Sequence, residues 1–139
     1  MLNWLKSSST APKTLGQRGE EFAQELYRQK GFVIVAANEF NKKGKRLGEI
    51  DFIAKNGQRL VFVEVKTRTA GNERFGSGAD AVNGQKQQRI LRAVKVYLLA
   101  HPEYRSLQPG IDVCVLEYRE LDKPEFYATI ITNGVEDWN

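Results

Sequence analysis

The sequence lacks the features that mark secreted and membrane proteins. Its 139 residues include one cysteine, Cys114, which cannot form a disulfide within the chain and suits a reducing compartment. No apolar run approaches the roughly 18 residues that a membrane-spanning helix needs. Residues 1–14 have neither the long apolar segment nor the small-residue cleavage site of a signal peptide. These absences argue against membrane and secreted classes and predict a cytoplasmic protein.

The composition is that of one globular domain. The chain is 41% hydrophobic and 27% charged, and its length fits a single domain. Residues 1–14 show no sustained periodicity and predict a flexible tail, which leaves 15–139 as the domain. The 21 Lys and Arg against 17 Asp and Glu give a net charge of +4, which favours polyanionic partners without establishing one.

Hydrophobic periodicity predicts two helices and five strands. Helical spacing of apolar residues covers 15–30, ended by Gly31, and 85–100. Runs rich in β-branched and aromatic residues predict strands at 32–37, 47–54, 60–66, 111–118 and 126–131. The order α-β-β-β-α-β-β predicts an α/β fold in which helices pack against a mixed sheet.

The second and third predicted strands form a hairpin that carries several acids. Asn56-Gly57 is typical of a two-residue turn. With that turn, the numbers of paired residues sum to 113, so Glu49 would face Glu64 across the hairpin. Asp51 would lie diagonal to Glu64 on the same face of the sheet. The hairpin therefore predicts a cluster of carboxylates.

Such a cluster needs a compensating charge. Carboxylates that face each other across two strands repel, and partly burying these charges costs roughly several kcal/mol more in folding free energy. A hard divalent cation would offset that cost, because Mg²⁺ prefers oxygen ligands, and it would suit phosphoryl transfer. Lys66, on the same face as Glu64, would orient water or stabilise developing charge. The alternative is that Glu64 and Lys66 form an ordinary ion pair on a solvated sheet surface.

Two further acids have two interpretations each. Glu20 lies beside Ala23 and Tyr27 at the margin of the apolar face of the first helix, so its carboxylate can lean over the sheet and join the cluster. Taken alone, it is better explained as a first-turn acid that the helix dipole stabilises. Asp112 is either a strand-edge acid, the interpretation that we slightly favour, or a minor contributor to the cluster.

Five short motifs follow one another along residues 15–135. They are Gly16-x-x-Gly19-Glu20, Gly48-Glu49-Ile50-Asp51, Phe62-Val63-Glu64-Val65-Lys66-Thr67-Arg68, Phe75-Gly76 and Lys86. In this order and at these spacings they resemble the YraN family of small bacterial proteins. Members of that family are described as predicted endonucleases, similar to the Holliday-junction resolvases of the PD-(D/E)XK nuclease superfamily.

The resemblance implies a restriction-endonuclease-like core, α-β-β-β-α-β, with a mixed sheet and a C-terminal hairpin strand. It implies a Mg²⁺ or Mn²⁺ site formed by Asp51, Glu64 and the backbone carbonyl of Val65. Lys66 would be the catalytic lysine and Glu20 the first-helix acid. The activity would be hydrolysis of DNA phosphodiester bonds, with branched DNA of the Holliday-junction type among the candidate substrates.

The resemblance also bears on partners. Resolvase-like enzymes cut two strands and commonly pair, so a homodimer is expected. One alternative is a non-catalytic nucleic-acid-binding protein that keeps the nuclease-like fold. Another is an interaction module in DNA repair or recombination whose protein partner supplies the chemistry.

Basic and polar residues flank the acids in the sequence. Those assigned to nucleic-acid contacts are Lys43, Lys45 and Arg46, then Arg68 and Arg74, and finally Gln85, Lys86 and Arg89 on the second helix. Contacts from such residues to phosphates hold nucleic acid without reading its bases. Each run taken alone is also compatible with a solvated face, and on the second helix the charged residues are expected on the arc opposite the apolar stripe.

Overall fold

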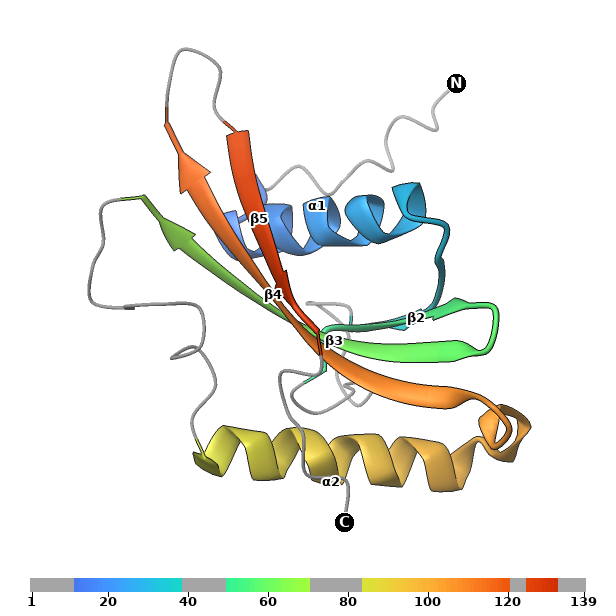
Figure 1. Ribbon diagram of the computed structural model, residues 1–139. Helices are drawn as coiled ribbons and strands as arrows, with labels where there is room; N and C mark the ends of the chain where they lie inside the picture. Colours follow the sequence, from blue (N-terminus) through green and yellow to red (C-terminus); the bar gives the residue numbers. More distant parts are fainter. Residues whose placement is uncertain (1–11, 39–49, 71–83, 121–124, 133–139) are drawn as a thin grey trace, which may run out of the picture.

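The computed structural model describes residues 12–38, 50–70, 84–120 and 125–132 (Figure 1). Its elements are α1 (Leu15–Gln29), β1 (Val33–Ala37), β2 (Phe52–Asn56), β3 (Arg59–Thr69), α2 (Gly84–Ala100), the short 3₁₀ helix η4 (Pro102–Tyr104), β4 (Gln108–Arg119) and β5 (Glu125–Ile131). This order confirms the predicted mixed α/β class. Of the predicted tail, only residues 12–14 lie within the described part.

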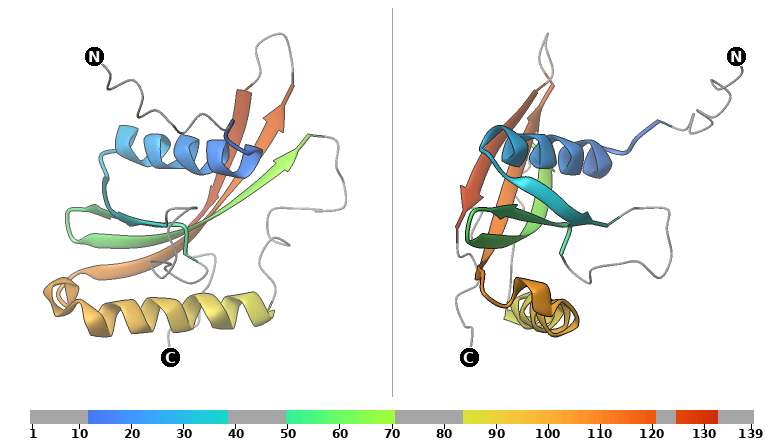
Figure 2. Two further views of the ribbon diagram at one scale, coloured as in Figure 1. Left: turned by 180° about the vertical axis from the view of Figure 1, so that it is seen from behind. Right: turned by 90° about the vertical axis from the view of Figure 1, so that its right-hand side faces the viewer.

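The five strands form one sheet in the order β1-β2-β3-β4-β5. β3 and β4 are parallel, with α2 as their crossover connection, and the other neighbours are antiparallel. α1 covers one face of the sheet and α2 covers the other (Figures 1 and 2). The molecule therefore has three layers, and each strand residue faces one helix or the other.

Strand alternation divides the core into two clusters. One lies under α1 and contains Ala23, Tyr27, Phe52, Ala54, Val61, Val63, Cys114 and Leu116. The other lies under α2 and contains Ile50, Ile53, Leu60, Phe62, Ile90, Leu91, Val94, Ile111, Val113 and Val115. Cys114, in the cluster under α1, is a buried free thiol. Both faces of the central strands are apolar, as expected of a sheet covered on both sides.

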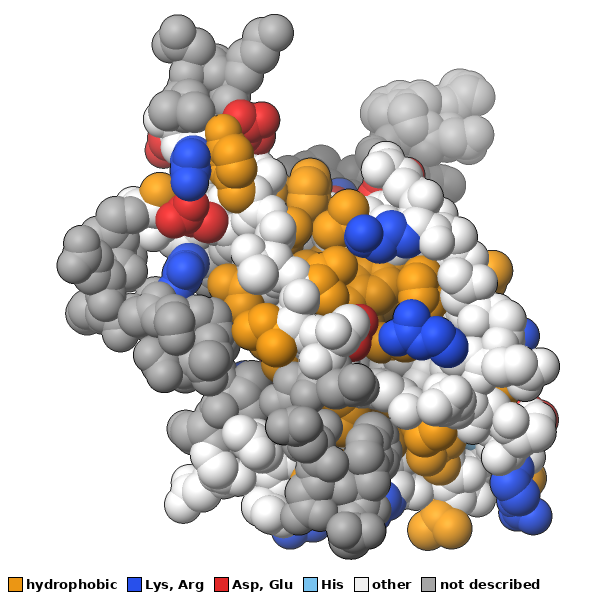
Figure 3. Space-filling model, in the orientation of Figure 1, with side chains coloured by type: hydrophobic (Ala, Val, Ile, Leu, Met, Phe, Trp, Pro, Cys, Tyr) orange, Lys and Arg blue, Asp and Glu red, His pale blue; other side chains and the backbone are white. Residues whose placement is uncertain are grey.

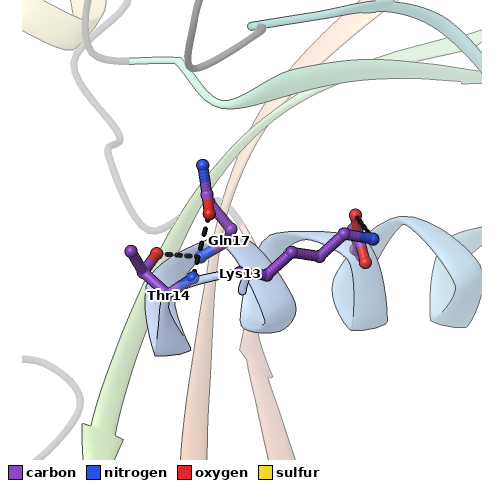
Figure 4. A network of polar contacts seen from close by, with 4 residues as sticks. Lys13, Thr14 and Gln17 are labelled. Carbon is purple, nitrogen blue, oxygen red and sulfur yellow. Dashed lines mark hydrogen bonds and ion pairs between the residues drawn. The ribbon is translucent and has the colours of Figure 1, made fainter. Parts of the chain in front are cut away.

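The ends of α1 follow from local chemistry. The Thr14 hydroxyl accepts a hydrogen bond from the Gln17 backbone N–H at 3.1 Å, and the Gln17 side chain accepts one from the Thr14 N–H at 2.9 Å (Figure 4). This capping box satisfies two backbone donors at the helix start. Gly31, with φ of +96°, follows the helix end in a conformation that favours glycine. In the described parts of the chain, neither helix is long and apolar enough to cross a membrane.

The predicted turn of the β2–β3 hairpin is wrong by one position. Asn56 pairs with Arg59, so the two turn residues are Gly57 and Gln58, and paired numbers sum to 115 rather than 113. β2 also begins later than predicted, at Phe52. A shift of two in the sum preserves which residues share a face, because side chains alternate with a period of two. Asp51 therefore lies at the end of the ladder closest to Glu64, and Glu49 is outside the described residues.

Asp112 is neither of the two acids that the sequence suggested. It lies on β4, which has neighbours on both sides, and its side chain is 3% exposed. Its Oδ2 accepts a hydrogen bond of 2.7 Å from the Tyr27 hydroxyl on α1. Burial, and then this hydrogen bond to Asp112, strongly raise the pKa of Tyr27. We conclude that Asp112 fixes α1 to the sheet from within the core.

Candidate active site

Among the described residues, the pairing of β2 with β3 reaches no further along β3 than Val63. Phe52, the first residue of β2, pairs with Val63, and Asp51 just before it donates its own N–H to the Val63 carbonyl at 2.9 Å. Its Oδ2 accepts a hydrogen bond of 2.7 Å from the Val65 backbone N–H. The Asp51 carboxylate thus accepts a hydrogen bond from the β3 backbone where a paired strand would offer a carbonyl, and it lies beside β3.

Glu64 reaches the same place from β3 itself. Alternation puts its side chain on the α2 face with Leu60 and Phe62. It is 5% exposed, and its carboxyl group hydrogen bonds to that of Asp51. Its Oε2 lies 2.9 Å from Nζ of Lys86, in the first turn of α2. Glu64 therefore joins the β3 edge to the start of α2.

Glu20 approaches from the opposite layer. It is on the buried face of α1 and is 4% exposed. The preceding Gly19 lets the helix lie so close to β3 that an added Cβ would overlap the Thr67 hydroxyl. The carboxyl group of Glu20 interacts with Asp51, while its Oε2 has no hydrogen-bond partner among the described residues. The interpretation in which Glu20 joins the acids is the one that the structure bears out.

The three carboxyl groups hold protons more tightly than exposed acids do. Burial is the largest cause and raises the pKa of Glu20 to about 7, that of Glu64 to about 8, and that of Asp51 above its usual range. The hydrogen bond between Asp51 and Glu64 raises the pKa of Glu64 further and opposes the rise at Asp51. Removing the protons would leave adjacent negative charges in a largely buried place.

The donor atoms suit a hard divalent cation. In the described ranges, no three His, Cys, Asp or Glu side chains form a ready-made metal-binding group. A mixed set is still available from Asp51, Glu64 and the Val65 carbonyl. The Val65 N–H points to the side of β3 on which Asp51 lies, and a strand residue directs its carbonyl to the same side as its N–H. These are oxygen donors, which Mg²⁺ and Mn²⁺ prefer, and the residues present fit such an ion.

Basic groups border the acids on the α2 face. Lys66 and Arg68 follow Glu64 at the two-residue spacing that keeps them on its face, and both are half-buried. The first turn of α2 carries no acid, so the positive end of its dipole is not offset there. Gln85 and Arg89 are exposed in the first two turns of that helix. The predicted phosphate contacts at Lys43, Lys45, Arg46 and Arg74 lie outside the described residues.

Lys86 is not on the solvated arc where we expected it. Its side chain is 22% exposed and contacts Glu64. The signal was present in the sequence, because Lys86 precedes Ile90 by four residues and Val94 by eight, and both of these are buried. Residues four apart lie on one helix face, so Lys86 extends the apolar stripe of α2 toward the acids.

Comparison with known proteins agrees with the motifs. A UPF0102 protein of Caldanaerobacter subterraneus is 43% identical over 101 residues, covering 73% of this chain and 77% of that protein. UPF0102 proteins of Carboxydothermus hydrogenoformans and of a Synechococcus strain are each 36% identical, over 78% and 86% of this chain and 86% and 87% of theirs. The model of UPF0102, described as an uncharacterised protein family, matches residues 19–116. The chain therefore belongs to the UPF0102 family, which is the YraN family that its motifs resemble.

Proposed function

We propose that the protein is a metal-dependent endonuclease that hydrolyses phosphodiester bonds of DNA, with branched DNA as the preferred substrate. The observation that carries the proposal is the convergence of Glu20 from α1, Asp51 from the residue before β2 and Glu64 from β3 itself, beside the start of β2. Burying three carboxyl groups together is unfavourable for folding alone. Their placement is therefore better explained by a bound cation and the chemistry that it supports.

Each residue has a role in this proposal. Asp51, Glu64 and the Val65 carbonyl hold Mg²⁺ or Mn²⁺, which when bound polarises the scissile phosphate and lowers the pKa of an attacking water. Glu20, whose Oε2 lacks a hydrogen-bond partner in the described part, accepts a proton beside them. Lys66, on the face of Glu64, stabilises the negative charge that develops on the phosphate.

The basic border supports DNA as the substrate. Lys66 and Arg68 follow Glu64 on its face of β3, and Arg89 is exposed in the second turn of α2, whose first turn carries no acid. Such basic groups attract phosphates. Contacts of this kind position the backbone and carry no base sequence. Recognition by DNA shape, such as the branching of a junction, is consistent with such a surface.

Cleavage of a labelled four-way junction and of a matched linear duplex tests the proposal. We expect cutting with Mg²⁺ or Mn²⁺, stronger on the junction, and its loss in Asp51→Asn and Lys66→Ala. Glu21→Gln is the matched control, because Glu21 is an exposed acid next to Glu20 that pairs with Lys13 instead. Cutting that persists in Asp51→Asn, or that Glu21→Gln also abolishes, would contradict the assigned site.

One contact favours a second function. The Lys86 ammonium already neutralises Glu64 at 2.9 Å, as an internal counter-ion would in a non-catalytic nucleic-acid-binding protein. Calorimetric titration with Mn²⁺ alone separates the two functions. The nuclease requires a binding site that Asp51→Asn removes. Salt-sensitive junction binding with no Mn²⁺ site would favour the non-catalytic protein.

A further inference from the structure

The two edges of the sheet differ in how they are protected. β1, at one edge, has five residues, and a bulge interrupts its pairing between Ile34 and Ala36. β5, at the other edge, has seven residues paired with β4 in an unbroken register. Natural edge strands are usually protected by bulges, prolines or lysines, which prevent pairing with another chain. β5 has no bulge, proline or lysine, and after Glu125 it has no charge.

The β5 edge also exposes apolar surface. Figures 1 and 3 view the molecule from this edge, with β5 in front, and hydrophobic side chains gather there between the two helices. Phe126 packs on Phe22 of α1, with ring centroids 5.2 Å apart, although Phe22 is still 37% exposed. The apolar layer between α1 and the sheet thus reaches the surface beside β5. Such a surface is typical of an interaction site.

The side chains of β5 are already held in place by the protein's own contacts. The ring centroids of Phe126 and Tyr118 lie 5.3 Å apart, and the Arg119 guanidinium carbon lies 3.8 Å from the centroid of the Tyr127 ring. The Tyr127 hydroxyl donates a hydrogen bond of 2.8 Å to Glu125. A partner strand would therefore meet an edge with an unbroken register and preorganised side chains, so that little ordering is needed on binding.

We propose that β5 is the interface of a two-fold symmetric dimer, in which the β5 strands of two copies pair antiparallel and join the sheets. A regular pair of this symmetry places one residue opposite itself, and the middle residue of β5 is Ala128, which is small and exposed. Phe126 then faces Ile130 of the second copy, and Tyr127 faces Thr129. Aromatic and β-branched residues are favourable cross-strand partners.

The position of the charged residue in β5 agrees with this antiparallel register. The one charged residue of the strand, Glu125, is at its end, so the two copies of Glu125 lie at opposite ends of the interface. No like charges face each other across it. The sequence of β5 is thus complementary to itself in the antiparallel direction, which is the property that identifies a second copy as the partner. The inference does not depend on the proposed nuclease activity.

Sedimentation velocity of the full chain at micromolar concentrations tests the dimer. We expect the wild type to sediment as a dimer, and Ala128→Lys to sediment as a monomer with an unchanged circular dichroism spectrum, because two lysines would face each other at the axis. Val33→Lys is the matched control, since Val33 is 66% exposed on the β1 edge, and it should remain a dimer. A monomeric wild type, or dissociation by Val33→Lys and not by Ala128→Lys, would overturn the proposal.

A disulfide tests the register. Residues opposite each other in an antiparallel pair have Cα atoms roughly 4.5–5.5 Å apart, which a disulfide can span. Ala128→Cys should therefore form a covalent dimer on mild oxidation, while Val33→Cys should not. The native Cys114 is buried and does not interfere. If neither variant cross-links, or if both do equally, β5 does not pair in this way.

Hydrogen exchange tests whether the β5 edge is free to pair. Backbone amides of β5 that stay protected from exchange in a monomer would show that another part of the chain covers the edge, and would also overturn the proposal.

Discussion

At the scale of single residues, Glu20 and Glu64 couple protonation to stability. Burial raises their pKa values from 4.5 to about 7 and about 8. An acid with a higher pKa in the folded protein binds more protons when folded, so its contribution is complete below its unfolded pKa and is lost as the pH rises through its folded pKa. Without metal, we therefore expect the free energy of unfolding to fall as the pH rises from about 5 to about 8.

Urea unfolding in the presence of a chelator, at a series of pH values, measures this dependence. Glu64→Gln replaces the acid by a neutral group of similar shape, so its stability should fall less steeply with pH. Glu21→Gln serves as the control, because Glu21 is exposed and should leave the wild-type slope unchanged. Stability that rises across the same interval would show that the carboxyl groups are ionised and compensated in the folded protein.

At the scale of elements, the close packing of α1 on β3 brings Glu20 to the site. Gly19→Ala would force the new methyl group against Thr67 and to within 3.3 Å of Leu116. We expect a loss of about 1–3 kcal/mol in the free energy of unfolding, the usual cost of overpacking. Because Glu20 is the next residue, moving the helix away should also weaken Mn²⁺-dependent cleavage.

Gly16→Ala is the matched substitution on the same helix. Its added methyl group would have its nearest neighbour at 3.9 Å, so we expect no loss and a gain of up to about 1 kcal/mol from helix propensity. Unfolding in urea measures both variants. Equal effects of the two substitutions would show that helix propensity, rather than contact with β3, determines the result.

The elements themselves were predictable because their patterns are local. Apolar spacing and turn residues indicated the helices, the strands and their order. The turn at Asn56-Gly57 was misplaced because the dipeptide preference is local, whereas the register is also set by which residues of β2 and β3 must be buried. Asp51 was predicted to lie diagonal to Glu64 on the same face, and the shared face holds because an error of two in the sum does not change which residues share a face.

Long-range contacts were harder to predict. The position of Asp112 depends on Tyr27, which is 85 positions away in the sequence, and on β5 covering the outer side of β4. No local sequence pattern predicts the contact with Tyr27 or the pairing of β5 with β4. Lys86 had a usable signal in its spacing from Ile90, but a charged residue on an apolar stripe becomes meaningful only when its partner, Glu64, is known to lie opposite.

At the scale of the whole molecule, the positions of the charged residues determine how the protein would bind a polyanion. The net charge is +4. Glu20, Asp51 and Glu64 lie together, and Lys66 and Arg68 follow Glu64 on its face of β3, whereas the buried Asp112 bonds to Tyr27 instead. If DNA binds over this place, its affinity should fall steeply with salt, because each phosphate contact releases bound counterions. Arg89→Gln and Arg68→Gln should each reduce the slope of log affinity against log salt by about 1, with the metal absent.

Arg28→Gln tests whether that effect belongs to the site. Arg28 is an exposed arginine in the last turn of α1, paired with Glu25, so it has the same charge on another element. We expect it to leave the salt slope unchanged in fluorescence-anisotropy titrations with a labelled junction. Asp51→Asn should bind metal-free junction at least as tightly as the wild type, since it removes an acid next to the phosphates. If Arg28→Gln lowers the slope while Arg89→Gln does not, DNA lies on a different surface, and the buried acids are not aligned with its backbone.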